Sequence, residues 1–135
     1  MGLRALAALV LVLPLLGCTA SDDATQLQGP TWRSVEVLGD PVTEDPPVTA
    51  TFAADDTVAG SSGCNRYTGP ARVTGDRLEV GPLASTMMAC EPTTVMERES
   101  AYLQALESAD RWERDGDRLR VRDTAGAVVL VFEAD

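Results

Sequence analysis

A glycine-rich block at residues 60–69 limits the possible folds of this chain more than any other feature. The block has the sequence GSSGCNRYTG, and a second block, ASTMMAC, follows at residues 84–90. Glycine adopts positive φ, or lets another part of the backbone approach closely, without a steric penalty. Each block also contains one cysteine, Cys64 or Cys90. We therefore expect the two blocks to form a tight structural junction that one covalent bond could link.

Residues 1–17 have the features of a secretory signal peptide. Arg4 supplies a positive charge, and residues 5–16 form an unbroken apolar run. This run is shorter than the ~20 residues of a transmembrane helix, but it fits the apolar core of a signal peptide. It leads into LLGC at residues 15–18, which resembles the lipobox of bacterial lipoproteins. The resemblance implies cleavage after Gly17 and acylation of Cys18; the alternative is an ordinary signal peptide in which Cys18 occurs by chance.

A lipid on Cys18 would hold the mature protein on a membrane, because two or more acyl chains anchor a protein stably. Residues 18–30 are mostly polar and have little apolar surface to bury. We predict that they form the lipidated N-terminus and a flexible tether, followed by one domain at residues 31–135. The expected location is the cell envelope, on the extracytoplasmic side of a bacterial membrane.

The charge of the mature chain excludes nucleic acid as a partner, and its residue composition excludes several kinds of catalytic site. Removal of residues 1–17 leaves 10 arginines against 21 acidic residues, a net charge of −11. Such a chain is repelled by nucleic-acid phosphates, so we expect no nucleic-acid partner. The absence of histidine and lysine excludes Ser-His-Asp and Ser-Lys sites and histidine-containing zinc sites. We predict no cofactor and no metal, and we expect a monomer whose partners are the membrane and an unidentified envelope protein or component.

Short alternating segments predict a β-rich domain. In residues 48–52 the alternation places Val48, Ala50 and Phe52 on one inward face. An Asp115-Gly116 turn between two alternating segments predicts a hairpin with Trp112 facing the core. The other predicted strands are residues 32–38, the two arms of a hairpin within residues 72–80, and the apolar run at residues 128–132, which we expect to be covered on both faces.

One amphipathic helix is predicted at about residues 94–109. Thr94 and Glu97 have the spacing of a capping box, in which each side chain bonds a main-chain N–H of the first turn. Met96, Leu103 and Leu106 fall on one stripe that we expect to face the core, with Ala109 at its end. The predicted fold class is therefore α+β: an antiparallel β-meander or partial barrel of seven to nine short strands with one helix packed on it.

The chain resembles the META/HslJ domain of bacterial envelope lipoproteins from about Leu27 to the C-terminus. The resemblance implies a small β-rich domain with a helix, located outside the cytoplasm, in a family named partly for heat-inducible members. No enzymatic activity is established for that family, so none is expected here. The residues that carry the resemblance are Trp32, the blocks at residues 60–69 and 84–90, Leu78, Glu97, Tyr102, Leu103, Leu106, Gly116, Leu119, Asp123 and Phe132.

Two groups of residues are candidates for a specific role. Cys64 and Cys90 favour a disulfide, because a pair of cysteines in an exported domain usually oxidises; the alternative is two buried free thiols. Asn65, Arg66 and Tyr67 are candidates for an exposed binding site, because loops between glycines present polar groups. The alternative, which we prefer, is that Asn65 satisfies main-chain groups of the turn and Tyr67 packs in the core.

These observations favour a non-enzymatic, membrane-anchored envelope lipoprotein of META/HslJ type that binds an envelope or protein partner, with a role in stress protection. The alternative is a small inhibitor or accessory chaperone of an exported hydrolase or assembly machine. A third reading is a hydrolase that uses two carboxylates, but no spacing among the 21 acidic residues singles out a pair.

Overall fold

The computed structural model describes residues 22–43 and 45–135. The predicted signal peptide and Cys18 lie outside the described residues. Within them the chain forms two helices, α1 (Asp22–Leu27) and α2 (Thr93–Glu107). The strands are β1 (Thr31–Val37), β2 (Asp40–Pro41), β3 (Thr49–Ala53), β4 (Thr57–Ser61), β5 (Arg66–Thr74), β6 (Arg77–Val80), β7 (Ala84–Ser85), β8 (Arg111–Asp115), β9 (Arg118–Arg122) and β10 (Val128–Ala134).

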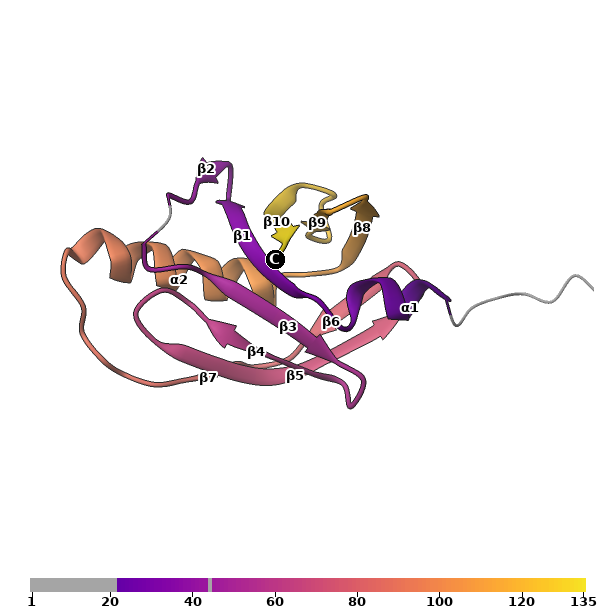
Figure 1. Cartoon of the computed structure of the whole chain (residues 1–135), viewed down its shortest axis with the longest axis horizontal. Helices are drawn as coiled ribbons and strands as arrows, with labels where there is room; N and C mark the ends of the chain where they lie inside the picture. The colour runs from indigo at the N-terminus through magenta and orange to yellow at the C-terminus, as the bar shows by residue number, and fades with distance from the viewer. Residues whose placement is uncertain (1–21, 44) are drawn as a thin grey trace, which may run out of the picture.

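Eight antiparallel strands close into a barrel, and α2 lies alongside it (Figure 1). The order around the barrel is β10-β9-β8-β6-β5-β4-β3-β1, and pairing of β1 with β10 closes it. The two-residue strands β2 and β7 lie outside this ring and pair with β1 and β5. The predicted α+β class, with one main helix on an antiparallel barrel, is confirmed. The strand count exceeds seven to nine because β2 and β7 are too short to produce a detectable alternation.

The predicted hairpins form where the turn chemistry is clearest. Asp115 pairs with Arg118 across Gly116, which has a φ of +60°. Trp112 and Val121 are register partners in this hairpin, and both are buried, as predicted. In β5 and β6, Thr74 pairs with Arg77 in the same way. These local signals were sufficient because a two-residue turn fixes the register of the strands it joins.

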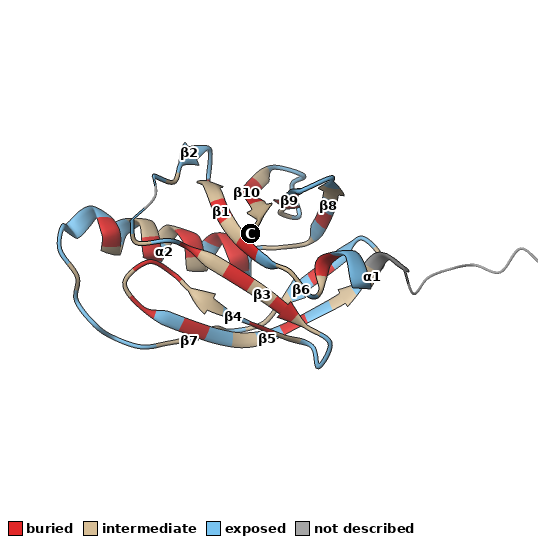
Figure 2. Cartoon of the chain, in the orientation of Figure 1, coloured by how far each residue is buried: buried red, intermediate tan, exposed pale blue. Residues whose placement is uncertain are grey.

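The predicted core positions of the strands are also confirmed. Val48, Ala50 and Phe52 are at most 1% exposed. Four consecutive residues of β10 are buried, which fits a strand covered on both faces. Figure 2 shows buried positions alternating with intermediate ones along β3, and further buried positions on α2. The core therefore fills the barrel and the space between the barrel and α2.

Two details of the helix prediction were wrong. The residue that precedes α2 is Pro92, and no side chain caps the first turn, so the proposed Thr94–Glu97 capping box does not form. The buried face is shifted from the predicted stripe. Of the predicted residues Leu106 is buried, whereas Met96, Leu103 and Ala109 are only half-buried. The face that packs on the barrel consists of Val95, Glu99, Tyr102, Ala105 and Leu106. It was missed because it contains a glutamate.

Part of the segment assigned to the tether is ordered on the barrel. Residues 22–27 form α1, and Leu27 is fully buried. The indole Nε1 of Trp32 donates a hydrogen bond to the main-chain oxygen of Leu27 at 2.9 Å. The packed part of the chain thus begins before residue 31, because Leu27 fills the core next to Trp32. Among the described residues, neither helix is long and apolar enough to span a bilayer.

Candidate functional site

A disulfide joins the two sequence blocks at one end of the barrel. Cys64 lies in the connection between β4 and β5, and Cys90 lies in the loop between β7 and α2. Their sulfurs are bonded, with 5.8 Å between the two Cα atoms. Of the two alternatives left open by the sequence, the structure contains the disulfide. The bond ties the segment at residues 84–90, called the Met loop below, to the barrel.

Glycines allow the close contacts at this junction, as expected from the sequence. Gly63 has a φ of +116°, a conformation that L side chains rarely adopt. A Cβ atom at Gly60 would collide with the main-chain oxygen of Thr49 on the neighbouring strand. Both glycines are therefore required by the backbone geometry.

Asn65 holds the main chain of the Met loop. Its side chain is buried, and the residue is 2% exposed. Its Oδ1 accepts hydrogen bonds from the main-chain N–H of Met88 at 2.7 Å and from the hydroxyl of Thr86 at 2.9 Å. Its Nδ2 donates to the main-chain oxygen of Met88 at 3.1 Å and to Glu99 at 2.6 Å. All the hydrogen-bonding capacity of the Asn65 side chain is used within the protein, as in the structural alternative preferred above.

Glu99 is a buried carboxylate that binds the other side of this junction. It is 5% exposed, and Oε2 accepts hydrogen bonds from the main-chain N–H of Asn65 and from the Ser62 hydroxyl, both at 2.7 Å. Burial raises its pKa, but hydrogen bonds from Asn65, Ser62 and the main chain of Cys64 outweigh burial, so the pKa of Glu99 lies below its usual value. The residue is therefore a charged structural link between α2 and the β4–β5 connection.

Tyr67 points into the barrel, where it meets Tyr102 of α2. The two hydroxyl oxygens are 2.6 Å apart, and Tyr67 donates to the main-chain oxygen of Thr49 at 2.8 Å. Burial raises the pKa of Tyr67 well above the usual tyrosine value, despite the hydrogen bond with Tyr102. Burial also raises the pKa of Tyr102, as does the adjacent Tyr67. The pair consequently stays neutral and belongs to the core.

Of the three residues considered for an exposed binding site, Arg66 alone lies on the surface. It forms no ion pair with any described residue. A shallow hollow of about 460 Å³ lies beside it. Its lining includes Ala59, Thr68, Ala84 and Thr86.

The exposed side chains of the Met loop were not identified from the sequence. Met87 is 97% exposed and Met88 is 58% exposed. A groove of about 410 Å³ runs between the Met loop and α2, and Met96 of α2 forms part of its wall. Methionine is usually interpreted as a core residue, so the residue type alone gave no signal of exposure.

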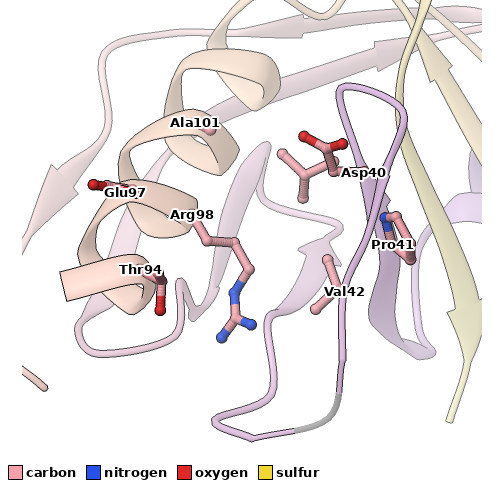
Figure 3. Close-up of a pocket in the computed structure, with 8 residues that line it drawn as sticks. Asp40, Pro41, Val42, Thr94, Glu97, Arg98 and Ala101 are labelled. Carbon is pink, nitrogen blue, oxygen red and sulfur yellow. The ribbon is translucent and has the colours of Figure 1, made fainter. Parts of the chain in front are cut away.

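A separate pocket of about 340 Å³ lies between α2 and the β1–β2 hairpin (Figure 3). Arg98 extends from α2 between Thr94 and Val42 in this view. Its guanidinium donates to the main-chain oxygens of Pro46 at 3.1 Å and Thr43 at 3.4 Å. Arg98 therefore fastens the loop after β2 to the helix.

The arginine row of β9 is matched by acidic residues. Glu113 of β8 lies 3.0 Å from Arg122 and 4.0 Å from Arg120, and Glu133 of β10 lies 3.7 Å from Arg118. Cross-strand pairing accounts for this row. No group of three or more Cys, Asp or Glu side chains in residues 22–43 and 45–135 is placed to hold a metal ion.

Comparison with known proteins agrees with this geometry. The sequence matches the META domain over residues 25–135. Among solved structures, an NMR structure of a protein from Burkholderia xenovorans is similar, with a TM-score of 0.64 and 24% identity over 100% of this chain and 99% of that chain. A second NMR structure gives a TM-score of 0.65 and 24% identity over 81% of this chain and 92% of that chain. The crystal structure of a DUF4847 family protein from Bacteroides vulgatus ATCC 8482 gives a TM-score of 0.59 and 17% identity over 79% of this chain and 93% of that chain.

The similarity to these structures extends to the fold alone. No curated protein matches the chain. The domain match, in contrast, includes both blocks of the disulfide junction and the whole barrel. This chain belongs to the META domain family.

Proposed function

We propose that this protein is a non-enzymatic, membrane-anchored envelope lipoprotein that binds a protein partner through the Met loop. The observation that carries the binding proposal is the contrast within this loop. Its main chain is fixed by Asn65 and by the Cys64–Cys90 disulfide, while Met87 and Met88 project outward. Unbranched, polarizable methionine side chains adapt to a variety of apolar partners.

The buried polar groups support a role without catalysis. Among the described residues Glu99 is the carboxylate that is buried, and its oxygens accept three hydrogen bonds from Ser62 and Asn65. A general acid or base needs access to a substrate proton and a pKa near the operating pH. Glu99 has a lowered pKa and both of its oxygens accept hydrogen bonds within the protein, which favours a structural role.

The anchor is supported by the sequence alone, from the apolar run at residues 5–16 and the lipobox-like residues before Cys18. A disulfide in the folded domain fits an oxidising compartment outside the cytoplasm. The resemblance to heat-inducible members leads us to include stress protection in the proposal.

A rigid loop with exposed apolar side chains also favours the second candidate, an inhibitor or accessory chaperone. Inhibitors of exported hydrolases present preformed loops, and preformed loops lose little conformational entropy on binding. Met87, at 97% exposed, would be the residue inserted into the partner.

Two experiments test the two parts of the proposal separately. For the anchor, cells are labelled with radioactive palmitate; the full chain should be labelled and membrane-bound, and Cys18→Ala should lose both properties. Unlabelled wild-type protein in the cytosol would overturn the anchor. For binding, a photocrosslinking amino acid replaces Met87 in intact cells, and Asp117 in an exposed turn serves as the control position. We expect one discrete partner to be captured at position 87 but not at position 117. Equal capture at the two positions, or no capture at position 87, would refute partner binding through the Met loop.

A further inference from the structure

The strand β7 has a main-chain edge that no described residue pairs. Thr86 N–H donates to the main-chain oxygen of Arg66, and Ala84 is the register partner of Thr68. In an antiparallel pair alternate residues bond to the neighbouring strand. Residues 84 and 86 therefore bond towards β5, and the N–H and C=O groups of Ser85 point away from it. Met87 has the same parity, and its main-chain N–H has no acceptor among the described residues.

Helix α2 covers this free edge only next to Leu83, which precedes β7. The main-chain N–H of Leu83 donates to Glu107 Oε1 at 2.9 Å, so the helix caps the edge just before β7. Beside residues 85–89 the helix and the loop separate and leave the groove of about 410 Å³. Its wall includes the side chains of Met87, Met88 and Met96. The charge in this groove is Glu99, whose oxygens already accept hydrogen bonds from Ser62 and Asn65. The free edge thus adjoins an apolar groove.

The other short strand outside the barrel is protected in a way that β7 is not. β2 consists of Asp40 and Pro41, and charged residues and proline discourage pairing at a sheet edge. β7 consists of Ala84 and Ser85, and the loop that continues it contains neither charge nor proline before Glu91. This edge therefore lacks the usual features that prevent strand addition.

The outer face next to β7 carries one unmatched charge. The side chains of Thr86 and Arg66 lie on the outer face of the sheet, because both residues alternate with the inward-pointing Tyr67 and Ser85. Arg66 is exposed and forms no ion pair with a described residue. A strand added beside β7 would place its outward side chains within reach of this guanidinium, and an acidic side chain would complement it.

We propose that the free edge of β7 binds an extended segment of a partner protein as an added strand. Alternate side chains of that segment are apolar and enter the groove beside Met88 and Met96, and an outward one is acidic and pairs with Arg66. This mode of recognition takes affinity from main-chain hydrogen bonds and specificity from alternate side chains. The inference rests on the proposed partner-binding role of the Met loop and names the chemistry of the partner.

Short synthetic peptides test the proposal on the full chain, purified as the cell processes it and labelled with ¹⁵N. One peptide alternates valine with glutamate, and its counterpart alternates valine with lysine. The glutamate peptide should shift the amide signals of residues 85–89 and slow hydrogen exchange at Ser85 and Met87. The lysine peptide should bind more weakly. Shifts spread over the molecule, or no shift at residues 85–89 with either peptide, would overturn the proposal.

Two pairs of variants separate the parts of the interaction. Arg66→Glu should weaken binding of the glutamate peptide about fivefold and reverse the preference between the two peptides. Arg72→Glu, on the same face of β5 and also without an ion pair to a described residue, is the matched control and should change little. Ser85→Pro removes the outward N–H without removing a bond to β5 and should abolish binding, whereas Ser85→Ala should not. Equal effects within either pair would contradict strand addition.

Failure of strand addition can be distinguished from failure of the proposed partner-binding function. If crosslinking at position 87 captures a partner but the peptides do not bind to β7, the Met loop binds a partner through its side chains alone and strand addition is wrong. If neither experiment detects binding, the partner-binding role itself fails.

Discussion

Asn65 donates hydrogen bonds to both carboxylate oxygens of Glu99. Its main-chain N–H lies 2.7 Å from Oε2, and its side-chain Nδ2 lies 2.6 Å from Oε1. The same side chain bonds the main chain of Met88. One asparagine therefore connects three parts of the chain: the β4–β5 connection, the Met loop and α2.

We expect Glu99→Gln to destabilise the protein by about 2–3 kcal/mol. A glutamine has one acceptor oxygen, so in either orientation its NH₂ group would face at least one of the Ser62 and Asn65 donors that now bond to Glu99. A buried donor left without an acceptor costs about 1–3 kcal/mol, and more where a charged group was its partner. Urea unfolding followed by circular dichroism measures the difference.

Glu97→Gln provides the control for this variant. Glu97 lies on the same helix but is exposed, so the same chemical change should alter the free energy of unfolding by less than about 0.5 kcal/mol. Similar losses of unfolding free energy in the two variants would show that the hydrogen bonds of Glu99 make no specific contribution to stability.

The stability of the wild-type protein should depend on Glu99 in the acidic range. Burial raises the pKa of Glu99, but the hydrogen bonds from Asn65 and Ser62 lower it more, so the folded protein binds this proton less readily than the unfolded chain. The contribution is fully present above the usual glutamate pKa of about 4.3 and is lost as pH falls through the lower pKa of the folded protein. Unfolding free energies measured against pH should therefore show the wild type and Glu99→Gln converging towards low pH. Parallel curves would refute this assignment.

The sequence predicted the strands and hairpins because their signals are local. The alternation around Phe52 and the Asp115-Gly116 turn each specify a structure within a few residues. The sequence predicted a meander or a partial barrel but not its closure, because the pairing of β1 with β10 joins residues about a hundred positions apart. No local pattern contains that information.

The face of α2 and the Met loop could not be predicted from residue type. Glu99 was not among the residues predicted to face the core, because a lone glutamate is rarely buried, but Ser62 and Asn65 supply the donors that make its burial possible. Met87 was assigned no role, although it is the most exposed large apolar residue described. Both results depend on contacts with segments more than twenty residues away, and only the folded structure reveals them.

Loss of the disulfide should destabilise the protein by about 3.5 kcal/mol. Cys64 and Cys90 are separated by 26 residues, and closing a loop of this size in the unfolded chain accounts for that estimate in the chain-entropy model. The double variant Cys64→Ala/Cys90→Ala tests this by urea unfolding under the same conditions. A reducing agent should lower the free energy of unfolding of the wild type by the same amount, but it should leave that of the double variant unchanged.

The disulfide variant should also release the Met loop locally. The bond fastens the loop at Cys90, and Asn65 fastens it at Met88, so hydrogen exchange at residues 88–91 should accelerate more than exchange in the β8–β9 hairpin. If all regions accelerate equally, the bond stabilises the domain as a whole and does not specifically hold the loop.

The two tyrosines should resist ionisation until the protein unfolds. They are the only tyrosines in the chain, and burial raises the pKa of both Tyr67 and Tyr102. A raised pKa means that their contribution to stability is fully present below the usual tyrosine pKa of about 10 and is lost as pH rises further. During a pH titration, the ultraviolet absorbance of tyrosinate should increase only when the circular dichroism of the native protein is lost. Ionisation at about pH 10 with native circular dichroism would place at least one hydroxyl in solvent and would contradict the buried Tyr67–Tyr102 pair.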